Sequence, residues 1–188
     1  MSSFIFRDKG APLFRDSCPP LIPVEAPLTL QRSSFNNPEE TVVLIQASLD
    51  TLGLFFPWAT KDYGPASFQQ WVDSVKQNEN TCEYDYRLAE KLIGHFAIRL
   101  SSSGLPEFGY WLGTTYAGYG YITKAIQASL PILREMGYTK VEVNYLPDNH
   151  RSRATALRNG FKELGLETIT QGHYPEGTVI MRSTLNLE

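Results

Sequence analysis

The sequence predicts a mixed α/β fold in which strands and helices alternate within one domain. Residues 107–161 follow the pattern strand, glycine turn, helix, strand and helix. Residues 82–100 contain two segments of alternating apolar residues on either side of a short turn, which is typical of an antiparallel hairpin. The chain has 188 residues, of which 42% are hydrophobic and 20% are charged. This length supports one domain with a substantial core and is too short for two domains that each have their own core.

The first 27 residues are rich in proline and show no periodic pattern. Their apolar anchors are Phe4, Ile5, Phe6, Leu13 and Phe14. We expect residues 1–27 to form an N-terminal extension, either a strap across the domain surface or a disordered leader, because Pro19 and Pro20 block regular structure. The main domain, residues 28–188, should begin with a strand over 28–32, where polar and apolar residues alternate.

Two amphipathic helices are expected next. The first has an asparagine cap, Pro38 at its first helical position and acids in its first turn, where the helix dipole favours them. It should end at Gly53, and its apolar stripe consists of Val42, Ile45, Leu49 and Leu52. The second helix should span 65–77, where apolar residues recur at helical spacing. These residues are Phe68, Trp71, Val72 and Val75.

The predicted hairpin turns at residues 89–91. Its alternating residues are Cys82, Tyr84, Tyr86 and Leu88 on one strand and Gly94, Phe96, Ile98 and Leu100 on the other. A loop at 101–104 follows, and Pro106 marks its end. The next strand should run from about Phe108 toward the glycine turn.

The remaining elements complete the alternation. The helix after Gly120 presents one apolar face, formed by Ile122, Ile126, Leu130, Leu133 and Met136. Pro131 should bend this helix, and Gly137 should cap it. A strand then turns Val141, Val143 and Tyr145 inward. Two final strands are expected over 162–170 and 177–187.

Charge and cysteine content favour an ordinary cytoplasmic protein. The formal net charge is -3, and only Arg151, Arg153 and Arg158 cluster, so we expect no nucleic-acid partner. The two cysteines, Cys18 and Cys82, form no framework or metal motif, which suits a reducing compartment. Neither a signal peptide nor an apolar run of membrane-spanning length is present in the sequence, so we expect no membrane partner.

The glycine turn at Gly118 and Gly120 leads directly into a helix. The first amides of a helix have no intrahelical acceptor, and the helix dipole favours negative charge beside them, so this turn predicts an anion site. Glycine at these two positions would let the backbone approach a phosphate closely. A tight turn with nothing bound is the alternative.

Three motifs, taken in order, resemble the GNAT superfamily of acetyl-CoA-dependent N-acetyltransferases. They are Gly109-Tyr-Trp-Leu112, Gly120-Tyr-Ile-Thr123 and Asn149-x-x-Ser152. The residues of these motifs are most similar to those of the branch named for the ribosomal-protein N-terminal acetyltransferases RimJ and RimL. The strong resemblance covers residues 92–161. It implies a GNAT-like twisted, mostly antiparallel mixed sheet with helices on both faces.

The resemblance also implies where acetyl-CoA binds. Backbone amides from Ala117 to Thr123 should hold the pyrophosphate, and the pantetheine arm should follow the strand edge near Leu112. The implied cofactor-binding residues are Leu112, Thr114, Ala117, Gly118, Tyr119, Gly120, Tyr121, Ile122, Thr123, Asn149 and Ser152. The family usually has Gln or Arg at the position of Ala117, and Gly or Ala at that of Ile122. The first departure removes a possible side-chain contact but leaves the amides in place.

The resemblance implies catalytic roles for a few of these groups. The amide near Leu112 would polarise the thioester carbonyl and stabilise the oxyanion. Asn149 would bond the cofactor arm, or it is simply a helix cap, a role that Asp148 could fill instead. Ser152 is the candidate that protonates or orients the leaving thiol, because the tyrosine that many members place seven residues after the asparagine is replaced by Ala156. A structural serine in the first helical turn is the alternative.

Glu107 stands where family members often have an acid that deprotonates the amine, and a solvent-facing glutamate on an edge strand is its alternative. In RimL-like proteins, Phe56 and Trp58 would shape the acceptor pocket, unless they are core aromatics. His173 and Tyr174 are fallback bases and substrate contacts. We expect His95 to be structural and His150 to belong to a helix start. Arg151 and Arg153 would reach the 3′-phosphate of the cofactor, or they lie on a solvated helix face.

The sequence therefore predicts an acyltransferase that moves an acetyl group from acetyl-CoA to a primary amine, with no metal. By resemblance the acceptor is a protein N-terminus, and the oligomeric state is a monomer or homodimer. Small-molecule acetylation, of an aminoglycoside or polyamine, is the first alternative, because the fold alone does not fix the substrate. A non-catalytic acyl-CoA-binding module is the second, and the substitutions at Ala117 and Ala156 keep it open.

Overall fold

The computed structural model describes residues 14–170 and 175–187 of the protein. These residues form an eight-stranded sheet in the order β1-β2-β3-β4-β5-β6-β8-β7. Every neighbouring pair of strands is antiparallel except β5 and β6, which run parallel. The strands are Leu21–Glu25 (β1), Leu28–Arg32 (β2), Thr81–Leu88 (β3), Lys91–Leu100 (β4), Pro106–Leu112 (β5), Lys140–Glu142 (β6), Lys162–Thr168 (β7) and Val179–Asn186 (β8).

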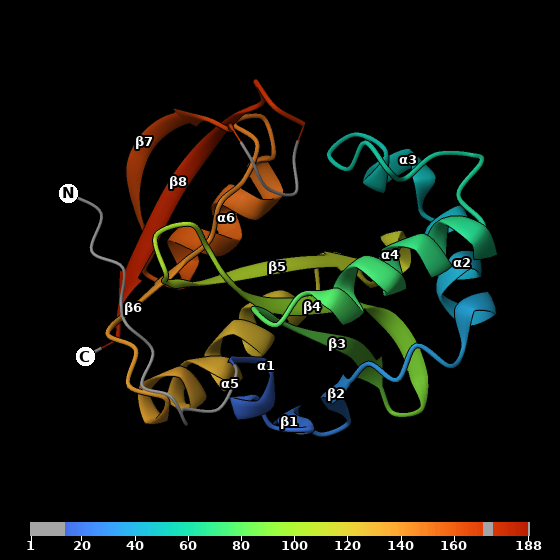
Figure 1. Ribbon diagram of the computed structural model, residues 1–188, viewed down its shortest axis with the longest axis horizontal. Helices are drawn as coiled ribbons and strands as arrows, with labels where there is room; N and C mark the ends of the chain where they lie inside the picture. Colours follow the sequence, from blue (N-terminus) through green and yellow to red (C-terminus); the bar gives the residue numbers. More distant parts are fainter. Residues whose placement is uncertain (1–13, 171–174, 188) are drawn as a thin grey trace.

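Helices cover both faces of this sheet. They are Phe14–Ser17 (α1), Pro38–Gln46 (α2), Leu49–Leu52 (α3), Pro65–Gln77 (α4), Tyr121–Glu135 (α5) and His150–Arg158 (α6). Figure 1 shows α5 on one side of the central strands and α2 and α4 on the other. The mixed α/β class and the mostly antiparallel sheet are therefore confirmed. Within the described residues, no helix is both long enough and apolar enough to cross a membrane.

The main core lies between the sheet and α5. Alternate residues of the central strands point into it, among them Tyr84, Phe96 and Phe108, which are all buried. The facing side of α5 contributes Ile126 and Leu133. The helix remains one element although Pro131 lies inside it, as the sequence predicted. Side chains return to the same face every two residues along a strand and every 3.6 residues along a helix. Each element therefore has one apolar face, and the two faces pack together.

The first described residues, 14–25, are built into the same core. Helix α1 packs beside β3, and β1 pairs with β2 at the edge of the sheet. Phe14 and Ile22 are both buried in the main core. Sequence analysis did not anticipate α1 or β1, since neither has a periodic pattern. Phe4, Ile5, Phe6 and Leu13 lie outside the described residues.

Cys18 and Cys82 form a disulfide bond across 64 positions of the sequence. The expectation that the two cysteines form no framework was wrong. The spacing of the two cysteines in the sequence does not predict this pair, because Cys18 comes close to β3 only when α1 packs against that strand. Cysteine usage therefore no longer supports the expected reducing compartment.

The second face of the sheet carries α2, α3 and α4 around a smaller core. Ile45, Leu52 and Phe68 are its buried centre. We predicted one helix through residue 52, but the chain breaks after Gln46 and restarts at Leu49. The buried side chain of Ser48 lies at this break, and its Oγ accepts a hydrogen bond from the amide of Thr114, 3.1 Å away. This tertiary contact accompanies the interruption of the helix.

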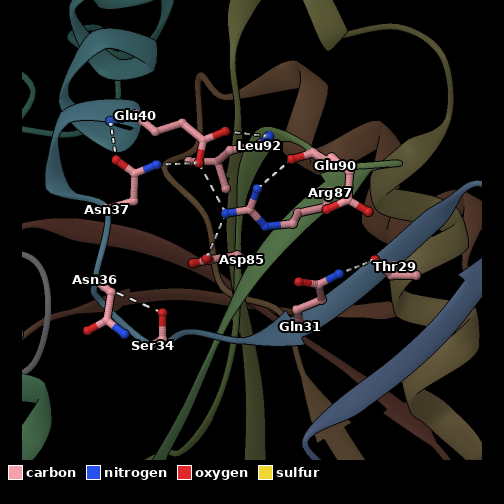
Figure 2. A network of polar contacts seen from close by, with 10 residues as sticks. All are labelled: Thr29, Gln31, Ser34, Asn36, Asn37, Glu40, Asp85, Arg87, Glu90 and Leu92. Carbon is pink, nitrogen blue, oxygen red and sulfur yellow. Dashed lines mark hydrogen bonds and ion pairs between the residues drawn. The ribbon is translucent and has the colours of Figure 1, made fainter.

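A polar network fixes the start of α2 to the β3–β4 hairpin (Figure 2). Asn37 caps α2 by accepting from the amide of Glu40, as expected of an asparagine before Pro38. The Glu40 carboxylate in turn accepts from the Leu92 amide at 3.0 Å and from the Arg87 guanidinium at 3.1 Å. These contacts hold α2 in a defined position over the hairpin.

Strands β5 and β6 separate soon after they meet. They share a single aligned pair, Glu107 with Glu142. Beyond it, the chain after β6 follows β8, where Tyr145 forms an isolated bridge with Met181. The inward residues Val141, Val143 and Tyr145 are buried as predicted. Strand β5 continues to Leu112 paired with β4 alone, so its other edge is open to a ligand.

Candidate functional site

A cavity of about 1250 Å³ occupies the second face of the sheet and the gap beside β5. Its walls come from segments far apart in the sequence. Among the lining residues are Phe56, Trp58, His95, Glu107, Gly120 and Ser152. The fold thus brings the predicted cofactor turn, the predicted catalytic residues and the aromatic segment around one space.

The glycine turn forms one end of this cavity. Gly118 and Gly120 have φ values of 90° and 74°, in the left-handed region that favours glycine. A Cβ at either position would meet no atom within 4 Å, so the backbone conformation, not crowding within the protein, requires glycine here. Helix α5 starts directly after Gly120, which has no side chain to cap it. The turn therefore has the geometry of an anion site.

The first turn of α5 carries unsatisfied polar groups. Within the described residues, the amides of Tyr121, Ile122 and Thr123 donate to no acceptor. The Thr123 hydroxyl oxygen is buried and has no hydrogen-bond partner. Buried polar atoms are normally paired, so these groups fit a bound anion. Tyr119 differs from the other predicted residues, because it is 65% exposed, stacks on Tyr121 and does not line the cavity.

The end of β5 offers one further amide to the cavity. The Gly113 amide donates to the Ile93 carbonyl of β4 at 2.9 Å. Successive amides of a strand point to opposite edges, so the Leu112 amide faces the open side, where β6 has separated. This orientation agrees with the predicted role of Leu112. Thr114 does not take the predicted role with its backbone, because its amide donates to Ser48 and its hydroxyl lies 2.5 Å from that of Thr51.

Helix α6 places two predicted residues on the cavity wall. The Asn149 side-chain oxygen accepts from the Ser152 amide at 3.0 Å, so Asn149 is the helix cap and Asp148 is not. The Ser152 hydroxyl lies 2.9 Å from the hydroxyl of Tyr110 on β5. Both residues line the cavity. Sequence analysis missed Tyr110, although its position in the Gly109-Tyr-Trp-Leu112 motif was a usable signal.

Ala156 is fully buried against the main core. A tyrosine at this position would require the surrounding core to repack. The phenol that contacts Ser152 instead belongs to Tyr110 of β5.

Glu107 lies on the cavity wall at the start of β5 and is partly buried, not a solvent-facing edge residue. Burial raises the pKa of its carboxyl above the usual range. The charge of Arg99 opposes this increase, and the carboxylate of Glu142 adds to it. A carboxyl with a raised pKa in a cavity is a candidate acid or base.

His95, which we expected to be structural, also lines the cavity. Its Nε2 lies 2.6 Å from Glu83 on β3, whose carboxylate is 3% exposed. Arg99 donates to both oxygens of that carboxylate, at 3.1 and 3.2 Å. Gly109 makes room for the Arg99 guanidinium, because a Cβ there would lie 2.9 Å from its Nη1.

Aromatic side chains form another part of the cavity wall. The Trp58 ring contacts the rings of Phe56, Tyr63 and Trp111, with centroids 5.3, 5.4 and 6.3 Å apart. Trp58 is 38% exposed, which is unusual for a core aromatic. Phe56 packs against the smaller core and also lines the cavity, so both expectations for it have support.

The arginines of α6 divide into two groups. Arg151 and Arg158 line the cavity. Arg153 instead forms an ion pair with Glu163 on β7, with 2.7 Å between Nε and Oε1, so it does not take the predicted phosphate role. His150 occupies the first position of α6, as expected. His173 and Tyr174 lie outside the described residues. Among the described residues, no group of three His, Cys, Asp or Glu is placed to hold a metal ion.

Residues 38–162 match the family model described as an acetyltransferase (GNAT) domain. The chain belongs to the GNAT acetyltransferase family. This confirms the expected class of acyltransferase and the expected co-substrate, acetyl-CoA. Among curated proteins, no sequence match to this chain was found.

Several solved GNAT structures share the fold. RimL, a ribosomal alpha-N-protein acetyltransferase in complex with coenzyme A, has a TM-score of 0.76 at 17% identity, over 88% of this chain and 97% of that one. The microcin self-immunity acetyltransferase MccE, in complex with acetyl-CoA and AMP, has a TM-score of 0.76 at 21% identity, over 87% and 94%. An acetyltransferase from Salmonella typhimurium that modifies the N-terminal serine of a ribosomal protein has a TM-score of 0.70 at 18% identity, over 89% and 99%. These identities support the fold and leave the acceptor open.

Proposed function

We propose that the protein transfers the acetyl group of acetyl-CoA to the α-amino group of a protein N-terminus. One observation carries the proposal: a single cavity joins a glycine turn with unsatisfied amides to a wall of aromatic and ionisable side chains. The first part suits a phosphate-bearing donor, and the second suits an amine-bearing acceptor.

The residues present fit the donor. The amides at the start of α5 and the Thr123 hydroxyl would hold the pyrophosphate, and the cavity-lining Arg151 and Arg158 are candidates for further phosphate contacts. The Leu112 amide and the Asn149 side-chain amide would hold the pantetheine arm. Acetyl-CoA supplies an acetyl group as a thioester, which amines attack more readily than they attack an ester or an acid.

The chain's own residues supply the proton transfers. The attacking amine must be neutral, and the departing sulfur must gain a proton. Glu107 is the base that the resemblance implied; its carboxyl group belongs to a residue that lines the cavity, and burial raises its pKa. Ser152 is the candidate on the thiol side, where the adjacent Tyr110 hydroxyl can pass a proton to it.

The charge of the cavity favours an N-terminus over a polycation. Its lining acids are Asp85 and Glu107, against Arg99, Arg151 and Arg158. A site for a polyamine or an aminoglycoside would need an excess of carboxylates. An α-amino group, with a pKa of about 8, also loses its proton far more readily than a lysine side chain does. The fold-level likeness to ribosomal-protein acetyltransferases supports the same choice.

The proposal includes a cytoplasmic setting, where ribosomal and other nascent protein N-termini are available. The Cys18–Cys82 disulfide bond is the observation that weighs against this part, because such bonds are uncommon in the cytoplasm. The disulfide lies between α1 and β3, and neither cysteine lines the cavity.

Isothermal titration and an acceptor screen test the function together. We expect micromolar binding of acetyl-CoA and of CoA, followed by thiol release that depends on an added amine. The screen would compare an octapeptide with a free N-terminal serine, its N-acetylated form, spermidine and kanamycin. Release with the free peptide alone supports the proposal, and release only with spermidine or kanamycin would replace it with small-molecule acetylation.

The remaining outcomes separate the other alternative. Binding of acetyl-CoA without release in the presence of any amine would favour an acyl-CoA-binding module. Absence of binding would refute the transferase function altogether.

A further inference from the structure

The two imidazole nitrogens of His95 differ in their hydrogen bonding. Nε2 lies 2.6 Å from a carboxylate oxygen of Glu83. Within the described residues, no hydrogen bond reaches Nδ1, and Nδ1 is not among the buried polar atoms that lack a partner. Since His95 lines the cavity, Nδ1 is the nitrogen that is left for a ligand.

Glu83 is held as a carboxylate. Burial by itself would raise its pKa, but the charge of Arg99 and the hydrogen bonds from His95 and Arg99 lower it well below the usual range. The Thr81 hydroxyl also donates to this carboxylate, at 2.6 Å. An ionised carboxylate only accepts hydrogen bonds, so a neutral His95 must carry its proton on Nε2. The lone pair is then on Nδ1.

The ring is fixed close to the end of β5. His95 on β4 is the cross-strand partner of Trp111, the residue before Leu112. Its ring stacks on that of Trp111, with ring centroids 6.4 Å apart. It also forms a T-shaped contact with the Trp71 ring, with centroids 5.2 Å apart. Glu107 lies four residues before Trp111, which is about 13 Å along a strand. His95 is therefore closer than Glu107 to the Leu112 amide.

We propose that His95 is the base that takes the proton from the acceptor amine, with Glu83 as the residue that positions it. This inference rests on the proposed function and deepens it. Glu83 acts through His95 and does not touch the acceptor. The arrangement gives His95 a fixed tautomer, a fixed orientation and a free lone pair, which are the three properties that a histidine base needs.

The protons balance in the following way. The acceptor enters as an ammonium ion and gives one proton to Nδ1, which frees the lone pair of its nitrogen. The bond between this nitrogen and the carbonyl carbon then forms, and the bond between carbon and sulfur breaks. The departing sulfur gains a proton from the Ser152 side, and the second proton of the nitrogen replaces the proton that this side has given. The proton on His95 passes to water, so the net products are the amide, CoA and one proton.

The charges around His95 come from two strands. On β3 are Glu83 and Asp85, and Asp85 is paired with Arg87 at 3.3 Å. On β4 is Arg99, which is paired with Glu83. The side chains of Trp71 and Trp111, on α4 and β5, carry no charge. Glu83 is therefore the charged group that holds the imidazole directly.

The tautomer of His95 is a first test, and it needs no acceptor. The sequence contains three histidines, so long-range nitrogen–proton NMR spectra resolve their imidazoles, and His95→Gln assigns the signal. At alkaline pH we expect the proton of His95 on Nε2 in the wild type. In Glu83→Gln we expect this preference to weaken, because the acceptor of the hydrogen bond is no longer charged. A wild-type signal with the proton on Nδ1 would overturn the proposal.

Kinetics are the second test, with the serine octapeptide as acceptor. His95→Gln is the sharpest variant, because a glutamine amide can still donate to Glu83 but cannot act as a base. We expect kcat to fall by about 10²-fold or more, which is the usual contribution of a general base. The dissociation constant of acetyl-CoA should stay within twofold. Exposed His150, which does not line the cavity, provides the matched control His150→Gln.

A comparison of variants separates the role of His95 from that of Glu107. A loss of activity confined to Glu107→Gln, with His95→Gln near the wild-type rate, would refute the proposal. Thiol release by the wild type tests the proposed function itself, whereas the ratio of variant to wild type tests His95.

Discussion

The hydroxyl oxygens of Ser152 on helix α6 and Tyr110 on strand β5 lie 2.9 Å apart. The two residues are 42 positions apart in the sequence, and each lines the same space. This pair connects the candidate catalytic serine that the resemblance implied with a phenol from the Gly109-Tyr-Trp-Leu112 motif to which the resemblance gave no role. A hydroxyl pair of this kind can deliver a proton to a departing sulfur.

The first prediction concerns this pair. Ser152→Ala should lower kcat by about 10²-fold, and Tyr110→Phe by about 10-fold, because each removes one member of the proton path. The double variant should be no slower than Ser152→Ala, since groups that act as a unit are not additive. Single-turnover rates and the dissociation constant of acetyl-CoA would be measured for all three. Strictly multiplicative losses would show that the two hydroxyls act separately.

The second prediction compares the two ends of α5. Gly120→Glu should abolish acetyl-CoA binding in calorimetry, because it adds a negative charge where phosphates are expected. Gly137→Glu is the matched control. Gly137 also has a left-handed φ, of 85°, and open space around its Cα, so this substitution brings the same backbone strain and charge to the other end of the helix. Equal losses of binding in both variants would disprove a phosphate site at the turn.

The third prediction concerns the aromatic wall. Trp58→Ala should raise the KM of the serine octapeptide by about 10-fold, equivalent to about 1.4 kcal/mol, while acetyl-CoA affinity changes less than twofold. Leu54→Ala is the control, since Leu54 is 70% exposed in the same loop and does not line the cavity. If Trp58→Ala lowers the melting temperature without changing KM, the tryptophan supports the fold instead of the acceptor.

The fourth prediction is a pH dependence of stability at Glu107, whose folded pKa lies above the unfolded value of about 4.3. Such a carboxyl binds its proton more tightly in the folded state. Its stabilising contribution is present below the unfolded pKa and is lost as the pH rises through the folded pKa. Glu107→Gln should therefore gain stability relative to the wild type as the pH increases. Urea unfolding at a series of pH values, beginning below the unfolded pKa and rising to neutral pH, would measure this gain.

The control for this measurement is Glu90→Gln, which changes an exposed carboxylate in the β3–β4 turn. A difference between Glu107→Gln and the wild type that stays constant with pH would contradict a raised pKa.

The fifth prediction concerns the disulfide between Cys18 and Cys82. Denatured, unreduced protein should show no free thiols. Reduction should lower the free energy of unfolding by about 2–4 kcal/mol, because the bond closes a long loop in the unfolded chain. Cys18→Ala provides the control, since a reducing agent should then have no further effect on stability. Two free thiols in the purified wild type would show that the disulfide bond does not form. The cysteine content would then again favour a reducing compartment.

Much of the fold follows from local patterns. The helix over 65–77 has the bounds that its apolar spacing predicts, and the hairpin of β3 and β4 follows from strict alternation. These elements are predictable because their side chains must alternate between core and solvent at the period of the backbone. Strand β1 was missed because it is short and contains Pro23. It is stable as an edge strand through pairing with β2, which no local pattern reveals.

The sequence by itself determined the fold class, the GNAT family and the glycine turn at the start of α5. Short motifs suffice for these features, because neighbours in the sequence create them. Only the tertiary structure decided which side chains share the cavity. It joined Ser152 to Tyr110, placed His95 beside Glu83 and Trp111, and directed Arg153 away to Glu163. Such contacts depend on strand register and on helices from distant segments, so their physical cause is packing, which local sequence does not contain.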